Sequence, residues 1–100
     1  MKPPKEAQLL ATVRQCIEIG RYLDSRHAFE RQQKRRISRP EILYVLLNGH
    51  HEKRKDRFDD LYGAWNYAIR GKTVDQRDLR IIVSFDRTGM LIITAIEIRR

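Results

Sequence analysis

The sequence predicts an α+β domain in which two to three N-terminal helices pack on a curved antiparallel sheet of three to four strands. Three observations lead to this prediction. Apolar residues recur at helical spacing in the first half of the chain, they alternate with polar residues in much of the second half, and a glycine-containing turn joins two long alternating runs. Because the chain has 100 residues, 41% of them hydrophobic, we expect a single domain over residues 1–100.

The helices are predicted from spacing and from capping residues. Residues 1–5 contain two prolines and are expected to form a flexible lead-in, followed by a helix over residues 6–19 that Gly20 ends. Asp24 or Ser25 can cap a second helix over residues 26–36. A third helix begins after Ser38, which forms a capping box with Glu41, and it ends at Gly49.

The strands are predicted from alternation. The most regular run, residues 79–98, is expected to form a β-hairpin whose turn is at residues 86–89, because Gly89 can adopt a positive φ. Residues 65–70 also alternate and predict a strand before this hairpin. We expect a short strand or loop over residues 50–57, a loop over residues 58–63, and a turn or bulge at Gly71 and Lys72.

Charge and composition narrow the class of function. The net charge of +8 and the pI of about 10.2 favour an anionic partner, and nucleic acid is the commonest one. The single cysteine excludes an internal disulfide and fits the cytoplasm, and no apolar run is long enough for a signal peptide or a membrane span. No Walker loop, nucleophile elbow or cysteine-rich zinc pattern is present, so we expect neither a metal nor a cofactor.

The basic residues are concentrated between residues 26 and 57, a stretch that contains ten Lys or Arg and only four acidic residues. On the second helix, His27, Arg31, Lys34 and Arg35 share one face. This face is either a solvated surface or a phosphate-binding surface. Nearby cations favour the neutral imidazole of His27, which is a competent general base, although a single helical histidine is often structural.

Further candidates lie on the predicted strands: Tyr67, Arg70, Lys72 and Arg80. We expect Arg70 and Lys72 to face the second helix, and the Tyr67 ring either to pack in the core or to stack on a base. Without a metal site, the chemistry open to this set is attack of an RNA 2′-hydroxyl on the adjacent phosphate. His27 would act as the base and the Arg and Lys groups would stabilise the charge.

Several motifs together resemble a known family. They are Ser25-Arg-His-Ala28 with Arg31, Arg35 and Arg36-Ile-Ser38, then Glu41-Ile-Leu43, Leu47-Asn-Gly49, Trp65-Asn-Tyr67-Ala-Ile-Arg70-Gly71-Lys-Thr73, Leu79-Arg-Ile-Ile-Val83 and Ile93-Thr94. The resemblance covers about residues 9–98. It is to small bacterial proteins of uncharacterised function that are grouped with the RNase toxins of barnase, EndoU, colicin and RelE type. The order of elements is also similar to that of the mRNA-cleaving toxin MqsR.

The resemblance implies a RelE/MqsR-like fold and a cytoplasmic endoribonuclease toxin that cleaves mRNA, either free or on the ribosome, and that a protein antitoxin inhibits. It implies catalytic roles for His27, Arg31, Tyr67, Arg70 and Arg80, and RNA contacts for Lys34, Arg35 and Lys72. The alternative is a non-catalytic protein: a ParE-like toxin directed at gyrase, a basic nucleic-acid-binding module, or an adaptor for an acidic partner. RNA cleavage in the presence of EDTA distinguishes the endoribonuclease hypothesis from the non-catalytic hypotheses.

Overall fold

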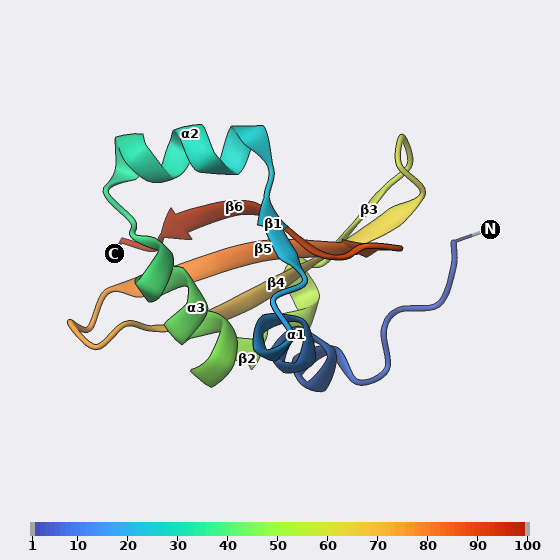
Figure 1. Ribbon diagram of the computed structural model, residues 1–100, viewed down its shortest axis with the longest axis horizontal. Helices are drawn as coiled ribbons and strands as arrows, with labels where there is room; N and C mark the ends of the chain where they lie inside the picture. Colours follow the sequence, from blue (N-terminus) through green and yellow to red (C-terminus); the bar gives the residue numbers. More distant parts are fainter. Residues whose placement is uncertain (1, 100) are drawn as a thin grey trace.

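The computed structural model describes residues 2–99, apart from the side chain of residue 27, and it shows helices on one side of a mixed sheet (Figure 1). The helices are α1 (Leu9–Glu18), α2 (Arg26–Arg35), α3 (Arg39–Asn48) and the short 3₁₀ helix η1 (Lys53–Lys55). The strands are β1 (Tyr22–Asp24), β2 (His50–His51), β3 (Arg57–Asp59), β4 (Ala64–Lys72), β5 (Asp78–Asp86) and β6 (Gly89–Glu97). The α+β class predicted from the sequence is therefore confirmed.

The sheet has more strands than the three or four predicted. Its six strands have the order β1-β6-β5-β4-β2, and β3 also pairs with β4. β1 pairs with β6 in parallel, whereas the other pairs are antiparallel. The three additional strands have only two or three residues each, too few to show alternation in the sequence. They form because a longer strand already offers an unpaired edge to which they can bond.

Two expected connections also differ from the structure. Residues 57–59, partly assigned to a loop, form β3 and make a hairpin with β4. Gly71 and Lys72, expected in a turn or bulge, continue β4 and pair with Leu79 and Asp78. The turn lies further on, where the backbone N–H groups of Gln76 and Thr73 bond within residues 73–77.

The helix ends follow the capping signals. Gly20 has a φ of 72° at the end of α1, and the Arg21 N–H bonds to the Cys16 carbonyl, as in a Schellman motif. The Ser25 side chain caps α2 by accepting a bond from the Ala28 N–H. At α3 the capping box of Ser38 and Glu41 is complete. These local predictions are confirmed.

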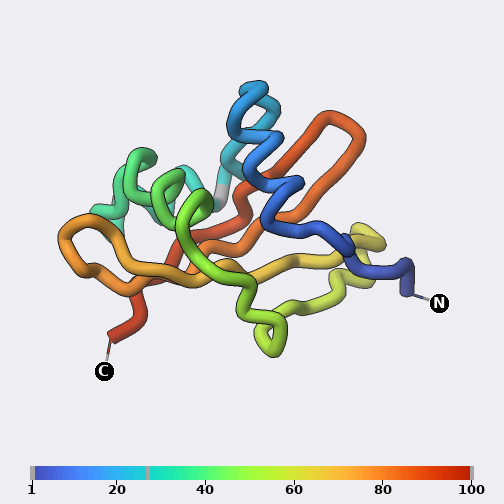
Figure 2. Tube along the Cα trace, turned by 90° about the horizontal axis from the view of Figure 1, so that it is seen from below, coloured from blue at the N-terminus to red at the C-terminus, as the bar shows by residue number. Residues whose placement is uncertain are grey.

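One core lies between the sheet and the three α-helices, which all lie on the same side of the sheet (Figure 2). Leu79, Ile81 and Val83 of β5 point into this core and are fully buried. Their neighbours along the strand, Arg80 and Ile82, therefore leave the sheet on the opposite side. None of the helices in the part of the chain that the structure describes is long and apolar enough to cross a membrane.

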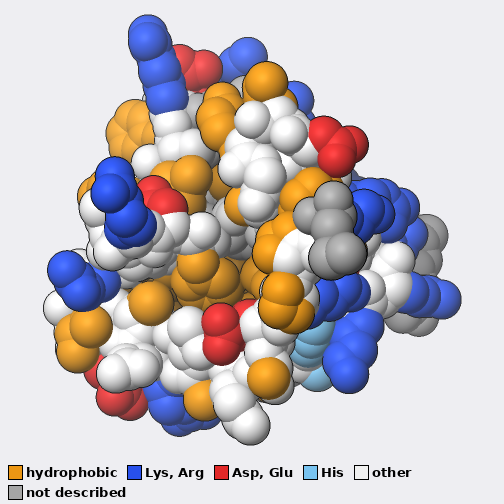
Figure 3. All heavy atoms as spheres, turned by 90° about the vertical axis from the view of Figure 1, so that its right-hand side faces the viewer, with side chains coloured by type: hydrophobic (Ala, Val, Ile, Leu, Met, Phe, Trp, Pro, Cys, Tyr) orange, Lys and Arg blue, Asp and Glu red, His pale blue; other side chains and the backbone are white. Residues whose placement is uncertain are grey.

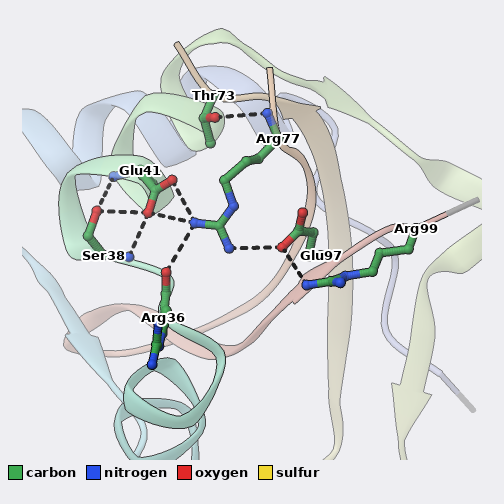
Figure 4. A network of polar contacts seen from close by, with 7 residues as sticks. All are labelled: Arg36, Ser38, Glu41, Thr73, Arg77, Glu97 and Arg99. Carbon is green, nitrogen blue, oxygen red and sulfur yellow. Dashed lines mark hydrogen bonds and ion pairs between the residues drawn. The ribbon is translucent and has the colours of Figure 1, made fainter. Parts of the chain in front are cut away.

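Arg77 joins three elements on the helix side of the sheet (Figure 4). Its Nη1 atom donates to Glu41 of the α3 capping box and to the Arg36 carbonyl at the end of α2, and its Nη2 atom donates to Glu97 of β6 at 2.9 Å. The bond to Glu97, followed by those to Glu41, raises the pKa of Arg77. One guanidinium group thus holds the junction between two helices and the sheet.

Candidate functional site

The face of the sheet that no α-helix covers carries a cluster of paired charged side chains; we call it the helix-free face. Arg70 of β4 and Arg80 of β5 are register partners, so their side chains leave the sheet side by side on this face. We expected Arg70 and Lys72, which is two residues further along β4 and shares its face, to face the second helix. That expectation was wrong, because α2 packs on β6 and β1 while Arg70 points away from all three α-helices.

Glu52 lies between the two arginines. Arg80 donates from Nε to Oε1 at 2.6 Å and from Nη2 to Oε2 at 3.2 Å, which makes a bidentate pair. Arg70 donates from Nη1 to Oε2 of Glu52 at 3.1 Å, and from Nε and Nη2 to both oxygens of Asp78. Two cations and two carboxylates therefore alternate on the helix-free face, and Glu52 is only 8% exposed.

The pairing with β4 continues one residue beyond β2 and places Glu52 opposite Ala68 on this face. The Ala68 carbonyl of β4 accepts a bond from the Glu52 N–H, and the Ala68 N–H donates to the Asp56 side chain at 3.0 Å. Residues 53–55, which form η1, therefore loop out between two points that are both tied to Ala68. Asp56 is also bound by His51 and Lys5 and has a fully buried side chain, so the base of the bulge is rigidly held.

The surroundings of Glu52 keep it ionised. The bond from Arg80, followed by the bond from Arg70, lowers the pKa of Glu52 from 4.5 to about 2, against the opposing effect of burial. The same contacts, with Asp78 contributing most, raise the pKa of Arg70. At neutral pH the cluster therefore holds an ionised carboxylate beside guanidinium groups, whose N–H donors also suit other anions.

His50 belongs to the same face. It is the register partner of Arg70, so the two side chains point the same way, and it is exposed. The neighbouring His51 points to the helix side, where its ring contacts Tyr67 at 6.0 Å between centroids. His50, Glu52, Arg70, Asp78 and Arg80 together are called the open-face cluster. A histidine, two carboxylates and two guanidinium groups are thus gathered on one surface.

Two further features border the open-face cluster. Lys53, Arg54 and Lys55, called the basic bulge, are all exposed, and no ion pair joins them to another described residue. At the other end of the same face, a groove of about 450 Å³ lies between the β3–β4 hairpin and the β5–β6 hairpin. In Figure 3, which looks onto this end of the molecule, hydrophobic side chains line a central hollow, acidic side chains lie near it, and most basic side chains lie toward the periphery of the view.

The residues predicted from the sequence do not all come together. Arg70 and Arg80 lie in the open-face cluster, and Lys72 is exposed on the same strand as Arg70. Arg31 and Lys34 are exposed on α2, and their side chains make no hydrogen bond or ion pair to another residue among those described. His27 lies outside the described residues.

Two other predicted residues are engaged in the fold. Tyr67 is buried on the helix side, and its hydroxyl accepts a bond from the Glu6 N–H at 2.8 Å. Arg35 donates to the Ala95 carbonyl at 2.8 Å and thereby covers the part of the β6 edge that β1 leaves unpaired. Both residues therefore have contacts that stabilise the domain.

His50 and Glu52 were not predicted as site residues. Their spacing of two residues is a signal for a shared strand face, but a two-residue strand inside a charged segment is too short to support that prediction. The contacts that make Glu52 part of the cluster are with Arg70 and Arg80, which lie 18 and 28 residues away in the sequence. Across residues 2–26 and 28–99, the structure has no group of three or more His, Cys, Asp or Glu side chains that could hold a metal ion.

Comparison with known proteins gives one family. The family described as "Domain of unknown function (DUF4258)" matches residues 25–97 of the chain, which include the open-face cluster and the groove. No curated protein and no solved structure gives a significant match.

Proposed function

The chain belongs to the DUF4258 family of domains of unknown function, and we propose that it is a metal-independent endoribonuclease that cleaves RNA on the helix-free face. The observation that supports this proposal is the placement of Glu52 between Arg70 and Arg80, with His50 on the same face. Cleavage by the 2′-hydroxyl needs a proton acceptor, a proton donor and cations around the phosphate. These four side chains supply all three.

The guanidinium groups would bind the scissile phosphate. Arg offers planar paired N–H donors that suit phosphate oxygens as well as carboxylate oxygens. A phosphate that competes for the donors of Arg80 and Arg70 would weaken the bonds that lower the pKa of Glu52. Binding of the substrate would therefore make Glu52 a stronger base at the moment when it has to accept a proton.

The reaction would proceed by transesterification. The 2′-hydroxyl gives its proton to Glu52 while its oxygen forms a bond to phosphorus. The bond between phosphorus and the 5′ oxygen breaks, and protonated His50 gives a proton to that leaving oxygen. The products are a 2′,3′-cyclic phosphate and a 5′-hydroxyl. Arg70 and Arg80 would stabilise the additional negative charge that develops on the phosphate in the transition state.

The biological setting that fits this activity is a toxin–antitoxin pair in the cytoplasm, with mRNA as the substrate. An antitoxin would inhibit the enzyme most directly by covering the helix-free face with a protein segment. Carboxylates on that segment would compete with RNA phosphates for Arg70 and Arg80. The toxin role and the partner rest on the family resemblance, whereas the chemistry rests on the open-face cluster.

A second candidate function is a non-catalytic nucleic-acid-binding module or a ParE-like interaction protein. One observation favours it: Arg70 and Arg80 are already paired with Glu52 and Asp78, as they would be in an ion-pair network that only stabilises the sheet. Such a protein would bind RNA in a salt-dependent way and leave it intact.

The deciding experiment is incubation of purified protein with RNA in EDTA, with and without ribosomes. We expect new 5′-hydroxyl ends and 2′,3′-cyclic phosphates from the wild type, and intact RNA from Glu52→Gln and Arg80→Met. His27→Ala in the same assay tests the histidine predicted from the sequence against His50. Intact RNA with the wild type under both conditions would exclude the enzymatic function and favour the binding module.

A further inference from the structure

We propose that the groove on the helix-free face is a subsite for a nucleobase, and that it prefers a base with neighbouring N–H donors, guanine above the others. This inference rests on the proposed function, since it places the base of an RNA chain whose phosphate lies at Arg70 and Arg80. The groove is lined by residues of three regions: Ser25, Asp59, Tyr62, Ala64, Asn66, Ser84, Phe85, Asp86, Leu91 and Ile93.

The position of the groove fits a nucleotide that is bound to the same face as the open-face cluster. Ser84 lies four residues from Arg80 along β5, and Asn66 lies four residues from Arg70 along β4. Four residues of strand span about 13 Å, a distance within the reach of a dinucleotide or trinucleotide. One chain could therefore hold its phosphate at the arginines and place a base in the groove.

The lining suits a base and disfavours a phosphate. Leu91 and Ile93 contribute an apolar floor, and Tyr62, which is 79% exposed, stands at the hairpin tip where its ring can stack on a base. Among the described residues that line the groove there is no Lys or Arg. The charges of the phosphates are instead matched by the arginines and by the basic bulge elsewhere on the face.

Two of the polar groups that line the groove, the carboxylates of Asp59 and Asp86, are acceptors only. Oδ1 of Asp59 binds the N–H groups of Leu61 and Tyr62, which fixes the carboxylate, and its Oδ2 atom makes no bond to another described residue. The Asn66 amide also has no side-chain partner among the described residues and can donate or accept. Guanine presents two adjacent N–H donors on its Watson–Crick edge, which suit a carboxylate, whereas uracil presents one.

A bulge in β6 shapes this end of the face. The register of β5 and β6 shifts between Ile82 and Val83, which leaves Ile93 as the extra residue. The Ile93 carbonyl accepts a bond from the Ser25 hydroxyl, which also caps α2. Next to it, Thr94 has a buried hydroxyl with no partner among the described residues, between the groove and Arg80. The groove is thus built on a distorted strand that the α2 cap holds in place.

The test is titration of ¹⁵N-labelled full-length protein with GMP, UMP and ribose 5-phosphate, followed by amide chemical shifts. We expect GMP to shift the amides of residues 62–66 and 91–93 and to bind about tenfold more tightly than UMP, and ribose 5-phosphate to leave these amides unchanged. Tyr62→Ala should weaken GMP binding at least about tenfold. The matched control is Leu61→Ala, which removes an equally exposed side chain of the same hairpin that does not line the groove.

Three results would overturn the inference: shifts caused equally by ribose 5-phosphate, equal losses in Tyr62→Ala and Leu61→Ala, or no shift of these amides on addition of GMP. The outcome is separable from that of the proposed function. GMP bound in the groove of a protein that cleaves no RNA supports the subsite and excludes the nuclease. Cleavage by Tyr62→Ala with unchanged rate and unchanged sequence preference supports the nuclease and excludes the subsite.

Discussion

Arg80 grips Glu52 through two nitrogen atoms, with Nε 2.6 Å from Oε1 and Nη2 3.2 Å from Oε2, although 28 residues separate them in the chain. Arg70 shares the same carboxylate. A nearly buried carboxylate with two guanidinium partners has consequences for stability, for acid sensitivity and for chemistry. The consequences for stability and acid sensitivity can be measured independently of whether RNA is the substrate.

Acid should remove a measurable share of the stability through Glu52. Its pKa is lowered from 4.5 to about 2, so its contribution is fully present above pH 4.5 and is lost as the pH falls toward 2. We expect Glu52→Gln to unfold more easily at pH 7, by on the order of 3 kcal/mol, and to match the wild type near pH 2.

Urea unfolding at a series of pH values measures this difference, with the exposed Glu18→Gln as control. A difference between wild type and Glu52→Gln that stays constant from pH 7 to pH 2 would contradict the role of the ionised carboxylate.

His50 should matter for cleavage and little for stability, because it is exposed on a two-residue edge strand. We expect His50→Ala to lower the single-turnover cleavage rate by about 10²-fold or more while leaving the thermal unfolding midpoint nearly unchanged. His51→Ala, at the neighbouring residue, is the control variant. It removes the bond to the buried Asp56 and should mainly lower stability. If the two variants lose the same activity, His50 is not the proton donor.

The basic bulge should contribute charge without sequence selectivity. Replacement of Lys53, Arg54 and Lys55 by Gln should reduce the slope of log affinity against log salt by about 2, at about 0.7 per lost phosphate contact. Filter binding of a single-stranded RNA at several salt concentrations gives this slope. The corresponding double variant Arg31→Gln, Lys34→Gln on α2 shows whether the helix face predicted from the sequence carries the contacts instead.

Gly89 should tolerate no side chain. Its φ is 138°, and an added Cβ atom would lie 2.3 Å from the Arg21 carbonyl oxygen, where the chain enters β1. We expect Gly89→Ala to cost about 3 kcal/mol. Gly63→Ala is the control: its φ is also positive, at 63°, but the space around it is open, so its cost should be about 1 kcal/mol. Equal losses in thermal unfolding would show that only the backbone angle matters at residue 89.

Replacement of Arg77 should destabilise the junction on the helix side of the sheet. Arg77→Met removes the bonds to Glu41, Glu97 and the Arg36 carbonyl together, and we expect a loss of about 1 to 3 kcal/mol. Arg99→Met is the matched control, because Arg99 also contacts Glu97 but is 84% exposed. Urea unfolding at pH 7 measures both. Similar values for the two variants would show that the junction does not depend on this guanidinium group.

The sequence by itself determined the elements whose causes are local. The caps at Gly20, Ser25 and Ser38 lie within a few residues of the groups they bond, and the alternation of residues 79–98 marks both arms of the terminal hairpin. Capping bonds and side-chain periodicity depend on residues that are close together in the chain, so the sequence predicts them directly. For that reason the helices and the long hairpin were predicted close to their positions in the structure.

Only the tertiary structure decided which side chains meet. The two-residue strand β2 exists because β4 offers an edge, and its register with β4 alone places His50 beside Arg70. In the sequence, Glu52 cannot be distinguished from an ordinary surface acid, whereas in the structure it lies between two arginines of neighbouring strands. Strand pairing joins residues distant in the chain, and a shift of one residue moves every side chain to the other face. The helix-free face is therefore a product of register, which no local pattern in the sequence encodes.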